Sequence, residues 1–336
     1  MPSYSSTMAA TTYLHRMKLI GPFFKLIRWP NLVFIAITQV LFNYGVVHPL
    51  FRQAGLSPNL NHTNFILLCI ASILIAAAGY IINDYFDVNI DQINKPEKVL
   101  VDRIIHRRWA IFWHMVLSML GVVLSFIVSF SLSDGYFVLG FVNFLCVLVL
   151  WVYSTTYKRQ ILVGNILVSI LTAWTVIIIY AAEIPHLWDV SPLVKQGYQQ
   201  ALTKLLRIAA LYGGFAFVIS LVREVTKDLE DIDGDRKEGC RTMPIVWGVP
   251  ASKIFAAVWL VVLIGILIVT QFYVIQFGWW LSALYIMVTV VLPLIYIMKW
   301  LYKANKTNDY AKLSRWIKIV MLTGILSMAF FRFYFK

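Results

Sequence analysis

Two segments of the sequence carry aspartates at the same spacing. Each follows the pattern D-x2-D-x3-D, and together they comprise Asp84, Asp87 and Asp91, then Asp228, Asp231 and Asp235. On a helix, positions i, i+3 and i+7 fall within an arc of about 60°. The spacing therefore predicts two acidic ridges of three carboxylates each, whereas Asp233 would point away from its ridge.

Clustered carboxylates repel one another unless a cation neutralises them. Oxygen ligands suit hard divalent cations, and Mg²⁺ commonly bridges a few carboxylates to the phosphates of a substrate. Basic residues flank both motifs, as a phosphate site requires: Lys95 and Lys98, then Arg223, Lys227, Arg236 and Lys237. The pattern favours a magnesium-dependent site for a phosphorylated substrate over the alternative, which is a solvated loop of mixed charge.

The rest of the chain must hold these loops at a membrane surface. Of its 336 residues, 60% are hydrophobic, 15% aromatic and only 13% charged, with a mean hydropathy of +0.76. A soluble domain is about 45–50% apolar and about 25% charged. We therefore expect an all-α polytopic membrane protein, and we find no nucleic-acid-binding signature to explain its net charge of +13.

Apolar runs long enough to cross a bilayer predict nine transmembrane helices in a single domain, 1–336. The N-terminal segment 1–30 shows no removable signal peptide, and Tyr13–Trp29, interrupted by Gly21-Pro22, is typical of an interfacial helix. The nine expected spans are 31–47, 65–82, 109–132, 136–153, 161–182, 208–223, 251–276, 279–302 and 316–334.

The basic residues predict the orientation of these spans. With nine helices, 23 of the 29 Lys and Arg residues fall on one side and 6 on the other. By the positive-inside rule, the N-terminus and both Asp-rich loops are cytoplasmic, and the C-terminus is outside, in a cell or inner membrane. Thirteen of the 16 acidic residues share the cytoplasmic side, an asymmetry that orientation does not require.

Cysteine and histidine offer no further site. Cys69, Cys146 and Cys240 form no CxxC pair, so we expect free thiols, and the six histidines show no zinc-ligand spacing.

Four motifs in this order resemble the UbiA superfamily of intramembrane prenyltransferases. The family carries NDxxDxxxD after its second helix, here from Asn83, and a second Asp-rich motif after its sixth. Between them, YSTTYKR with Tyr153 and Lys158, followed by Gly164-Asn165, is similar to the family's Tyr/Lys element. RWPN, before the first span, resembles its entry motif through Arg28 and Asn31.

The resemblance implies a nine-helix bundle that transfers a prenyl group from a polyprenyl diphosphate with Mg²⁺ as the cofactor. It implies catalytic roles for Asp84, Asp87, Asp228, Asp231, Tyr153 and Lys158. It implies metal binding by Asn83, Asp84, Asp87, Asp91, Asp228, Asp231 and Asp235. It implies substrate binding by Arg28, Asn31, Lys95, Lys158, Asn165, Arg223 and Lys227.

The acceptor is the open question. The motif regions look most similar to geranylgeranylglycerol-phosphate geranylgeranyltransferases, which implies a lipid acceptor, geranylgeranylglyceryl phosphate. However, the stretch from Lys98 to Arg103 reads KVLVDR where those enzymes carry RPLPSG. The alternative is an aromatic acceptor, 4-hydroxybenzoate or 1,4-dihydroxy-2-naphthoate.

Two other classes of protein fit the sequence less well. A cation-coupled transporter is a remote alternative, because transporter sites lie near the membrane midplane and these carboxylates lie at span ends. A CDP-alcohol phosphotransferase would need D-x2-D-G-x2-A-R, but Val88 and Asn89 follow Asp87.

Overall fold

The computed structural model describes residues 21–94 and 96–335. Within these ranges the nine predicted spans are confirmed, and the only β-structure is an isolated bridge between Val101 and Ile105. The spans are Trp29–Gln53, His62–Phe86, Arg107–Leu132, Val138–Thr155, Val163–Asp189, Pro192–Glu230, Gly248–Ile275, Trp280–Lys303 and Thr307–Tyr334.

Five spans are single α-helices: α4 (His62–Phe86), α6 (Arg107–Leu132), α7 (Val138–Thr155), α10 (Pro192–Glu230) and α13 (Gly248–Ile275). The fifth span joins α8 (Val163–Glu183) to α9 (His186–Asp189). The other three change helix type along their length: α2 (Trp29–Val40), η1 (Leu41–Val47) and α3 (His48–Gln53); α14 (Trp280–Ile286), η4 (Met287–Val291) and α15 (Leu292–Lys303); α16 (Thr307–Leu326), η5 (Ser327–Phe330) and α17 (Phe331–Tyr334).

Local signals explain where several helices begin. Asn61 caps α4 by accepting a hydrogen bond from the backbone N–H of Asn64 at 2.9 Å, and Pro192 opens α10 where no backbone donor is needed.

In the π-helix η1, Gly45 packs against the backbone of Met328, where an added Cβ would lie 2.9 Å from the carbonyl oxygen. The chain therefore needs a glycine at this close contact.

Two spans are much longer than predicted. The sixth was expected over 208–223, yet α10 begins at Pro192; the ninth was expected from 316, yet α16 begins at Thr307. The first turns of α10 carry lysine and glutamine, and those of α16 carry lysine and arginine; these residues are good helix formers but lower the local hydropathy. As a consequence Lys318, expected at the start of a span, lies about three turns inside a helix.

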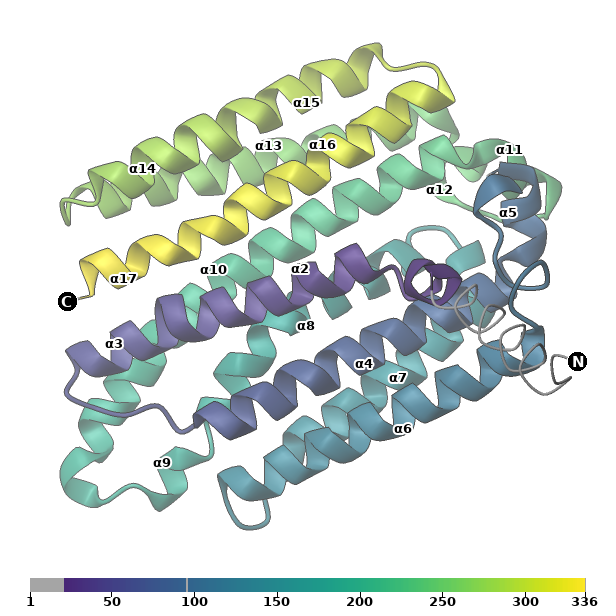
Figure 1. Cartoon of the computed structure of the whole chain (residues 1–336). Helices are drawn as coiled ribbons and strands as arrows, with labels where there is room; N and C mark the ends of the chain where they lie inside the picture. The colour runs from purple at the N-terminus through teal and green to yellow at the C-terminus, as the bar shows by residue number, and fades with distance from the viewer. Residues whose placement is uncertain (1–20, 95, 336) are drawn as a thin grey trace, which may run out of the picture.

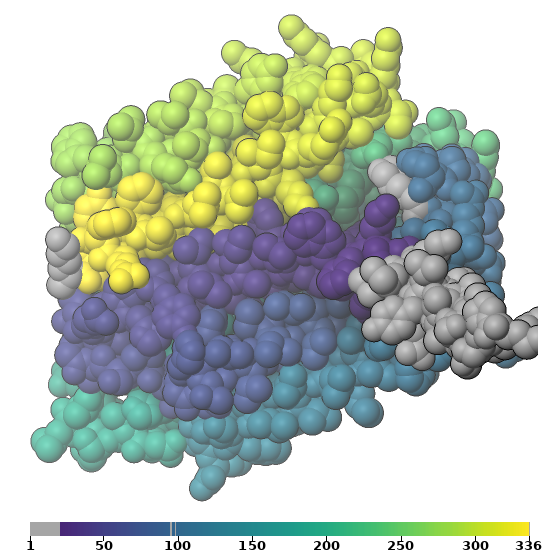
Figure 2. Space-filling model, in the orientation of Figure 1, coloured from purple at the N-terminus to yellow at the C-terminus, as the bar shows by residue number. Residues whose placement is uncertain are grey.

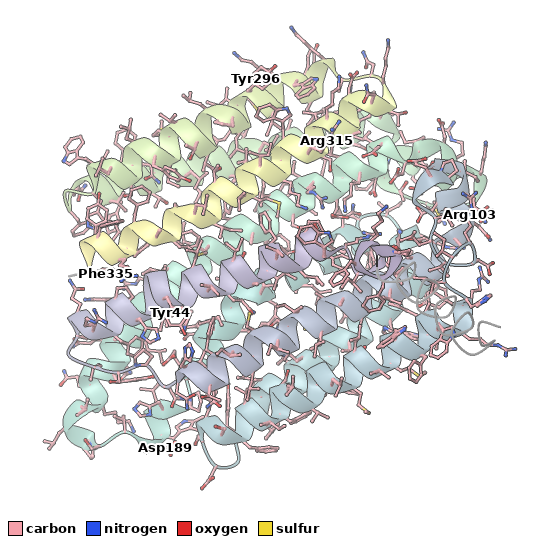
Figure 3. The ribbon with its side chains drawn as sticks, in the orientation of Figure 1. Tyr44, Arg103, Asp189, Tyr296, Arg315 and Phe335 are labelled. Carbon is pink, nitrogen blue, oxygen red and sulfur yellow. The ribbon has the colours of Figure 1, made fainter. Side chains whose placement is uncertain are left out.

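The helices form one bundle in which α10 packs against α8, α16 and α13 (Figure 1). The short helices α5 (Val88–Asn94), α11 (Ile232–Lys237) and α12 (Met243–Val246) lie together at one end, here called the motif end. The helices α3, α9 and α17 lie at the opposite end (Figure 1). In Figure 3, Arg103 marks the motif end, while Tyr44, Asp189 and Phe335 lie toward the other.

One face of the molecule shows α2 and α3 between α16 on one side and α4 and α6 on the other (Figure 2). Many large apolar side chains remain exposed on the bundle's surface, among them Val269, Phe272 and Leu284, each more than 60% exposed. Such an apolar exterior suits lipid rather than water. The three cysteines, which were expected to be free thiols, are all buried.

A buried carboxylate ties together the end opposite the motifs. Glu183 accepts hydrogen bonds from the backbone N–H groups of Asn59 and Leu60, at 2.6 and 3.2 Å, and from the hydroxyl of Tyr198 at 2.8 Å. These bonds connect the segment before α4 to α8 and α10. Glu183 is fully buried, and its contacts are those of a structural cross-link.

Candidate active site

Both Asp-rich motifs lie where a membrane span bends into a short helix. Asp84 is in the last turn of α4, Asp87 is the residue between α4 and α5, and Asp91 is in α5. The second motif repeats this arrangement, with Asp228 near the end of α10, Asp231 between α10 and α11, and Asp235 in α11. The prediction of a continuous helical ridge is wrong for both motifs, because each helix breaks at the middle aspartate.

The bend leaves the backbone hydrogen bonds in place. The N–H of Asp87 donates to the carbonyl of Asn83 at 3.0 Å, and the N–H of Asp91 donates to that of Asp87 at 2.8 Å. Asp231 has φ −101° and ψ 10°, close to the φ −90° and ψ 0° of Asp87. Each motif is therefore a kinked helix end. Asp233, which was expected to point away from the other aspartates of its motif, is exposed, whereas Asp235 is buried.

Cations hold the carboxylates of the first motif. Arg28 forms an ion pair with Asp84 at 2.6 Å, and Lys158 forms one with the buried Asp87. Asn83 donates its amide N–H to Asp87 at 2.6 Å and accepts from Lys158 at 3.3 Å. These contacts bring together residues from three predicted motifs, those of the first span, the second span and the turn after the fourth.

A side-chain amide positions the first aspartate of the second motif. Asn165, buried near the start of α8, donates to a carboxylate oxygen of Asp228 at 2.8 Å. Tyr153 lies beside this helix start, because a Cβ added to Gly164 would be 3.2 Å from its ring and 2.9 Å from the carbonyl of Tyr157. In the predicted Gly164-Asn165 element, the glycine thus lets the turn after α7 pack on the start of α8, and the asparagine binds Asp228.

Burial and neighbouring charges shift the pKa values of groups around the first motif. Burial, reinforced by the nearby carboxylate of Asp87, raises the pKa of Asp91 to about 6. Burial opposes the charged forms of Arg28 and Lys158, but their carboxylate partners outweigh it, so both pKa values lie above their usual range. Both cations therefore stay protonated at neutral pH.

The short helices that follow the two spans are clamped to each other. Asn94 of α5 accepts a hydrogen bond from the backbone N–H of Gly234 at 2.8 Å and donates one to the carbonyl oxygen of Asp231 at 3.1 Å. A Cβ at Gly234 would lie 2.4 Å from the Asn94 side chain. Sequence reasoning missed this pair, because neither residue type signals a contact across 140 positions.

One cavity of about 910 Å³ collects the predicted residues. Of the fifteen predicted site residues, fourteen line it, and Lys95 lies outside the described part of the chain. Polar groups from both motifs lie at the motif end, and apolar side chains from α2, α4, α8, α10 and α16 line the remainder, among them Phe34, Ile75, Leu171, Ile219 and Met321. The cavity therefore offers a charged compartment joined to an apolar one.

Among the lining residues that were not predicted, three bear on the chemistry of the cavity: Tyr80, Glu224 and Lys318. The guanidinium carbon of Arg28 lies over the ring of Tyr80, 5.2 Å from the ring centroid. Glu224 and Lys318 add charged groups to the cavity wall. A usable signal existed for Glu224 and Lys318: an ionisable residue within a span is by default functional. Glu224 was missed because the sixth span was predicted to end at 223, and Lys318 because, at the start of the ninth predicted span, it was counted with the basic residues of the preceding loop.

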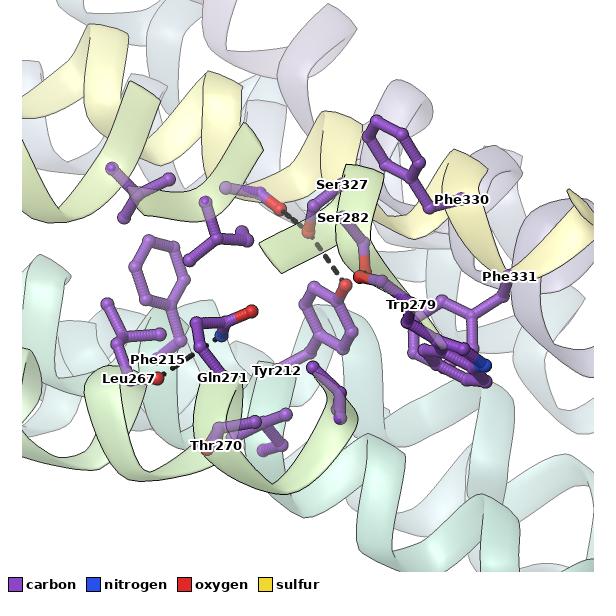
Figure 4. A pocket seen from close by; sticks show the side chains of 15 residues that line it. Tyr212, Phe215, Leu267, Thr270, Gln271, Trp279, Ser282, Ser327, Phe330 and Phe331 are labelled. Atoms are coloured by element: carbon purple, nitrogen blue, oxygen red, sulfur yellow. Dashed lines mark hydrogen bonds between the residues drawn. The ribbon is translucent and has the colours of Figure 1, made fainter. Parts of the chain in front are cut away.

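A smaller pocket of about 70 Å³ adjoins the apolar part of the cavity (Figure 4). Tyr212 and Phe215 line both spaces, and the Tyr212 hydroxyl is hydrogen-bonded to Ser327 at 2.7 Å. These two side chains therefore stand between the cavity and the pocket.

Among the described residues, no three His, Cys, Asp or Glu side chains are close enough to share one metal ion. All six aspartates of the motifs line the cavity, and three of them, Asp84, Asp87 and Asp228, are paired with Arg28, Lys158 and Asn165 respectively. Their oxygens and that of Asn83 are the donor type that hard cations prefer.

Comparison with known proteins agrees with this architecture. Residues 33–322 match the UbiA prenyltransferase family. The digeranylgeranylglyceryl phosphate synthase of Methanosphaera stadtmanae is 28% identical over 264 residues, which cover 78% of this chain and 85% of that protein.

Two solved structures share the fold. A structure described for digeranylgeranylglyceryl phosphate synthase in membranes superposes with a TM-score of 0.60 at 23% identity, covering 92% of this chain and 98% of that one. A UbiA homologue from Archaeoglobus fulgidus, bound to DMAPP and Mg²⁺, superposes with a TM-score of 0.56 at 15% identity, covering 91% and 99%. With both Asp-rich motifs on one cavity and a family match over most of its length, the chain belongs to the UbiA prenyltransferase family.

Proposed function

We propose that this prenyltransferase moves a geranylgeranyl group from its diphosphate to geranylgeranylglyceryl phosphate. The observation that carries the proposal is the cavity, in which both Asp-rich motifs and their cations open onto a long apolar space. A diphosphate suits the charged compartment and an isoprenoid tail the apolar one. The name of the Methanosphaera stadtmanae relative supports the choice of acceptor.

The chemistry of the donor groups, which are carboxylate and amide oxygens on one cavity wall, fits a requirement for magnesium. Because no three of the described carboxylates are yet close enough to share an ion, the side chains of Asn83, Asp84, Asp87 and Asp91 would have to move together to hold one ion, and those of Asp228, Asp231 and Asp235 to hold another. Bound Mg²⁺ would neutralise charge that develops on the leaving diphosphate. The Mg²⁺ bound to the Archaeoglobus fulgidus homologue supports this assignment.

The chain's own side chains account for the remaining steps. Lys158 and Arg28 donate hydrogen bonds to the diphosphate as the bond between C1 and oxygen breaks. Tyr153 lies near the allylic cation that forms, and the apolar wall keeps out water that would convert this cation to an alcohol. The acceptor hydroxyl then bonds to C1 and gives its proton to a carboxylate of the second motif.

The placement in the membrane follows from the family and the charges. The chain is an integral multi-pass membrane protein. We infer that residues 1–336 form one domain and that the N-terminus and both Asp-rich loops face the cytoplasm of a cell or inner membrane, as the basic residues predict.

The test offers the purified protein Mg²⁺, geranylgeranyl diphosphate and one acceptor at a time, with products identified by mass. The acceptors are geranylgeranylglyceryl phosphate, 4-hydroxybenzoate and 1,4-dihydroxy-2-naphthoate. We expect transfer to the first, and transfer only to an aromatic acid would overturn the proposal. Asp84→Ala and Asp231→Ala should each abolish turnover without preventing folding; wild-type activity in either variant would contradict the two-motif site.

A further inference from the structure

Three cations on the α10 and α16 wall of the cavity are not explained by the diphosphate site. Arg223 and Lys227 lie in the last two turns of α10, and Lys318 lies in α16. Arg223 and Lys318 are close enough for their charges to interact. Lys318 is about 16 Å along its helix from Thr307, well inside the span. It is the one lysine of α16 among the described residues that line this wall.

Their charges are only partly balanced within the protein. Glu224 accepts from Arg223 at 3.1 Å and from Lys227 at 2.6 Å, so two cations share one carboxylate. Lys318 donates to the amide oxygen of Asn31 and lies 6.0 Å from the ring of Phe34, and both of these partners are neutral. Among the ion pairs of the described residues, this group therefore retains a net charge of +2.

One donor in the group is also unused. The Nε of Arg223 is buried and has no hydrogen-bond partner among the described residues. A buried donor without a partner destabilises the protein, and buried unpaired charge does so more strongly. An anion in the cavity would offset both effects.

The charge of the group matches one class of ligand. A phosphate monoester carries about −1.5 to −2 at neutral pH and presents three acceptor oxygens. The carboxylate of an aromatic acid carries only −1. The diphosphate of the donor is already accommodated by the Asp-rich motifs together with Lys158 and Arg28, so the remaining phosphate is that of the acceptor.

We propose that Lys318, Arg223 and Lys227 form a second anion site that binds the phosphate of the glyceryl phosphate acceptor. This inference rests on the proposed function. Asn31 orients Lys318 through its amide oxygen, and it is only three residues from Arg28, the partner of Asp84. The two anion sites therefore adjoin, which brings the glycerol hydroxyl near the donor's C1.

The test measures KM for each substrate in Lys318→Met, in a nonionic detergent so that no anionic lipid headgroup competes. Because a hydrogen bond to a charged group is lost, KM for geranylgeranylglyceryl phosphate should rise roughly tenfold or more. KM for geranylgeranyl diphosphate should stay within twofold. Lys318→Arg should recover most of the acceptor affinity, and Lys312→Met, an exposed lysine of the same helix, should match wild type.

A neutral acceptor separates charge recognition from a general loss of structure. With geranylgeranylglycerol, which lacks the phosphate, Lys318→Met and wild type should have equal KM values. Equal increases for both acceptors, or an increase confined to the diphosphate donor, would overturn the second anion site. If Lys318→Met melts at a lower temperature, Lys318→Gln, which can still donate to Asn31, replaces it.

The outcomes also distinguish this inference from the proposed function. If wild type transfers to geranylgeranylglyceryl phosphate and no Lys318 variant alters its KM, the anion site is wrong and the proposed function stands. If wild type accepts only aromatic acids, the proposed function fails, and the phosphate site fails with it.

Discussion

Replacing Gly234 with alanine should loosen the clamp between the two Asp-rich motifs. The added Cβ would lie 2.4 Å from the Oδ1 of Asn94, so the Asn94 side chain must move. Overpacking of this kind costs about 1–3 kcal/mol. The movement also breaks two hydrogen bonds, from Gly234 at 2.8 Å and to Asp231 at 3.1 Å, worth about 1 kcal/mol each.

The total is about 3–5 kcal/mol, which lowers the equilibrium constant for packing of α5 on α11 by at least two orders of magnitude. Because Asp91 and Asp235 lie on these two helices, we expect kcat/KM for prenyl transfer to fall at least roughly tenfold. The assay is initial rate with saturating Mg²⁺. Gly214→Ala in α10 is the matched control, since a Cβ there meets nothing within 4 Å.

A second substitution tests the cause of the loss. In the double variant Gly234→Ala/Asn94→Ala the steric conflict is gone, so its kcat/KM should match that of Asn94→Ala alone. Losses that simply multiply would refute the clamp, and so would a Gly234→Ala protein with wild-type kcat/KM.

Three further outcomes are expected. Asn165→Ala should lower kcat/KM roughly tenfold, because Asp228 loses its buried amide donor; an unchanged value would show that this bond does not position the second motif. The Mg²⁺ concentration for half-maximal activity should rise as pH falls below about 6, since the Asp91 carboxyl is then protonated and cannot bind the ion; the same dependence in Asp91→Asn would assign it to another group. Glu183→Ala should lower the melting temperature in detergent through two unsatisfied backbone donors, about 2–4 kcal/mol, whereas the exposed Asp189→Ala should not; equal melting of both variants would contradict the cross-link.

The nine spans could be predicted because a bilayer imposes both length and composition on every helix that crosses it. The limits of α10 and α16 could not, since a helix continues past the apolar region wherever its residues tolerate it. The same error concealed Lys318, which the hydropathy boundary assigned to the edge of a span.

The members of the site were predictable from repeated spacing, whereas their arrangement was not. An unbroken helix would have placed Asp84 and Asp91 on one face, but the chain bends at Asp87, and nothing in the local sequence marks that bend. The contact between Asn94 and Gly234 depends on how two distant spans end side by side. Such pairs follow from the tertiary fold and leave no pattern in either segment alone.

Because of the bends at Asp87 and Asp231, each motif has its first aspartate in a membrane span and its last aspartate in a short helix. A ligand that contacts the residues on both sides of the bend would restrict the motion of the short helix relative to the span, so substrate binding would also make the motif more rigid. Backbone amides in α5 and α11 should then exchange hydrogen more slowly when Mg²⁺ and a diphosphate are present, while those in the middle of α6 keep their rate. The hydrogen-exchange rates of the short helices at the motif end would thus show whether a substrate occupies the cavity.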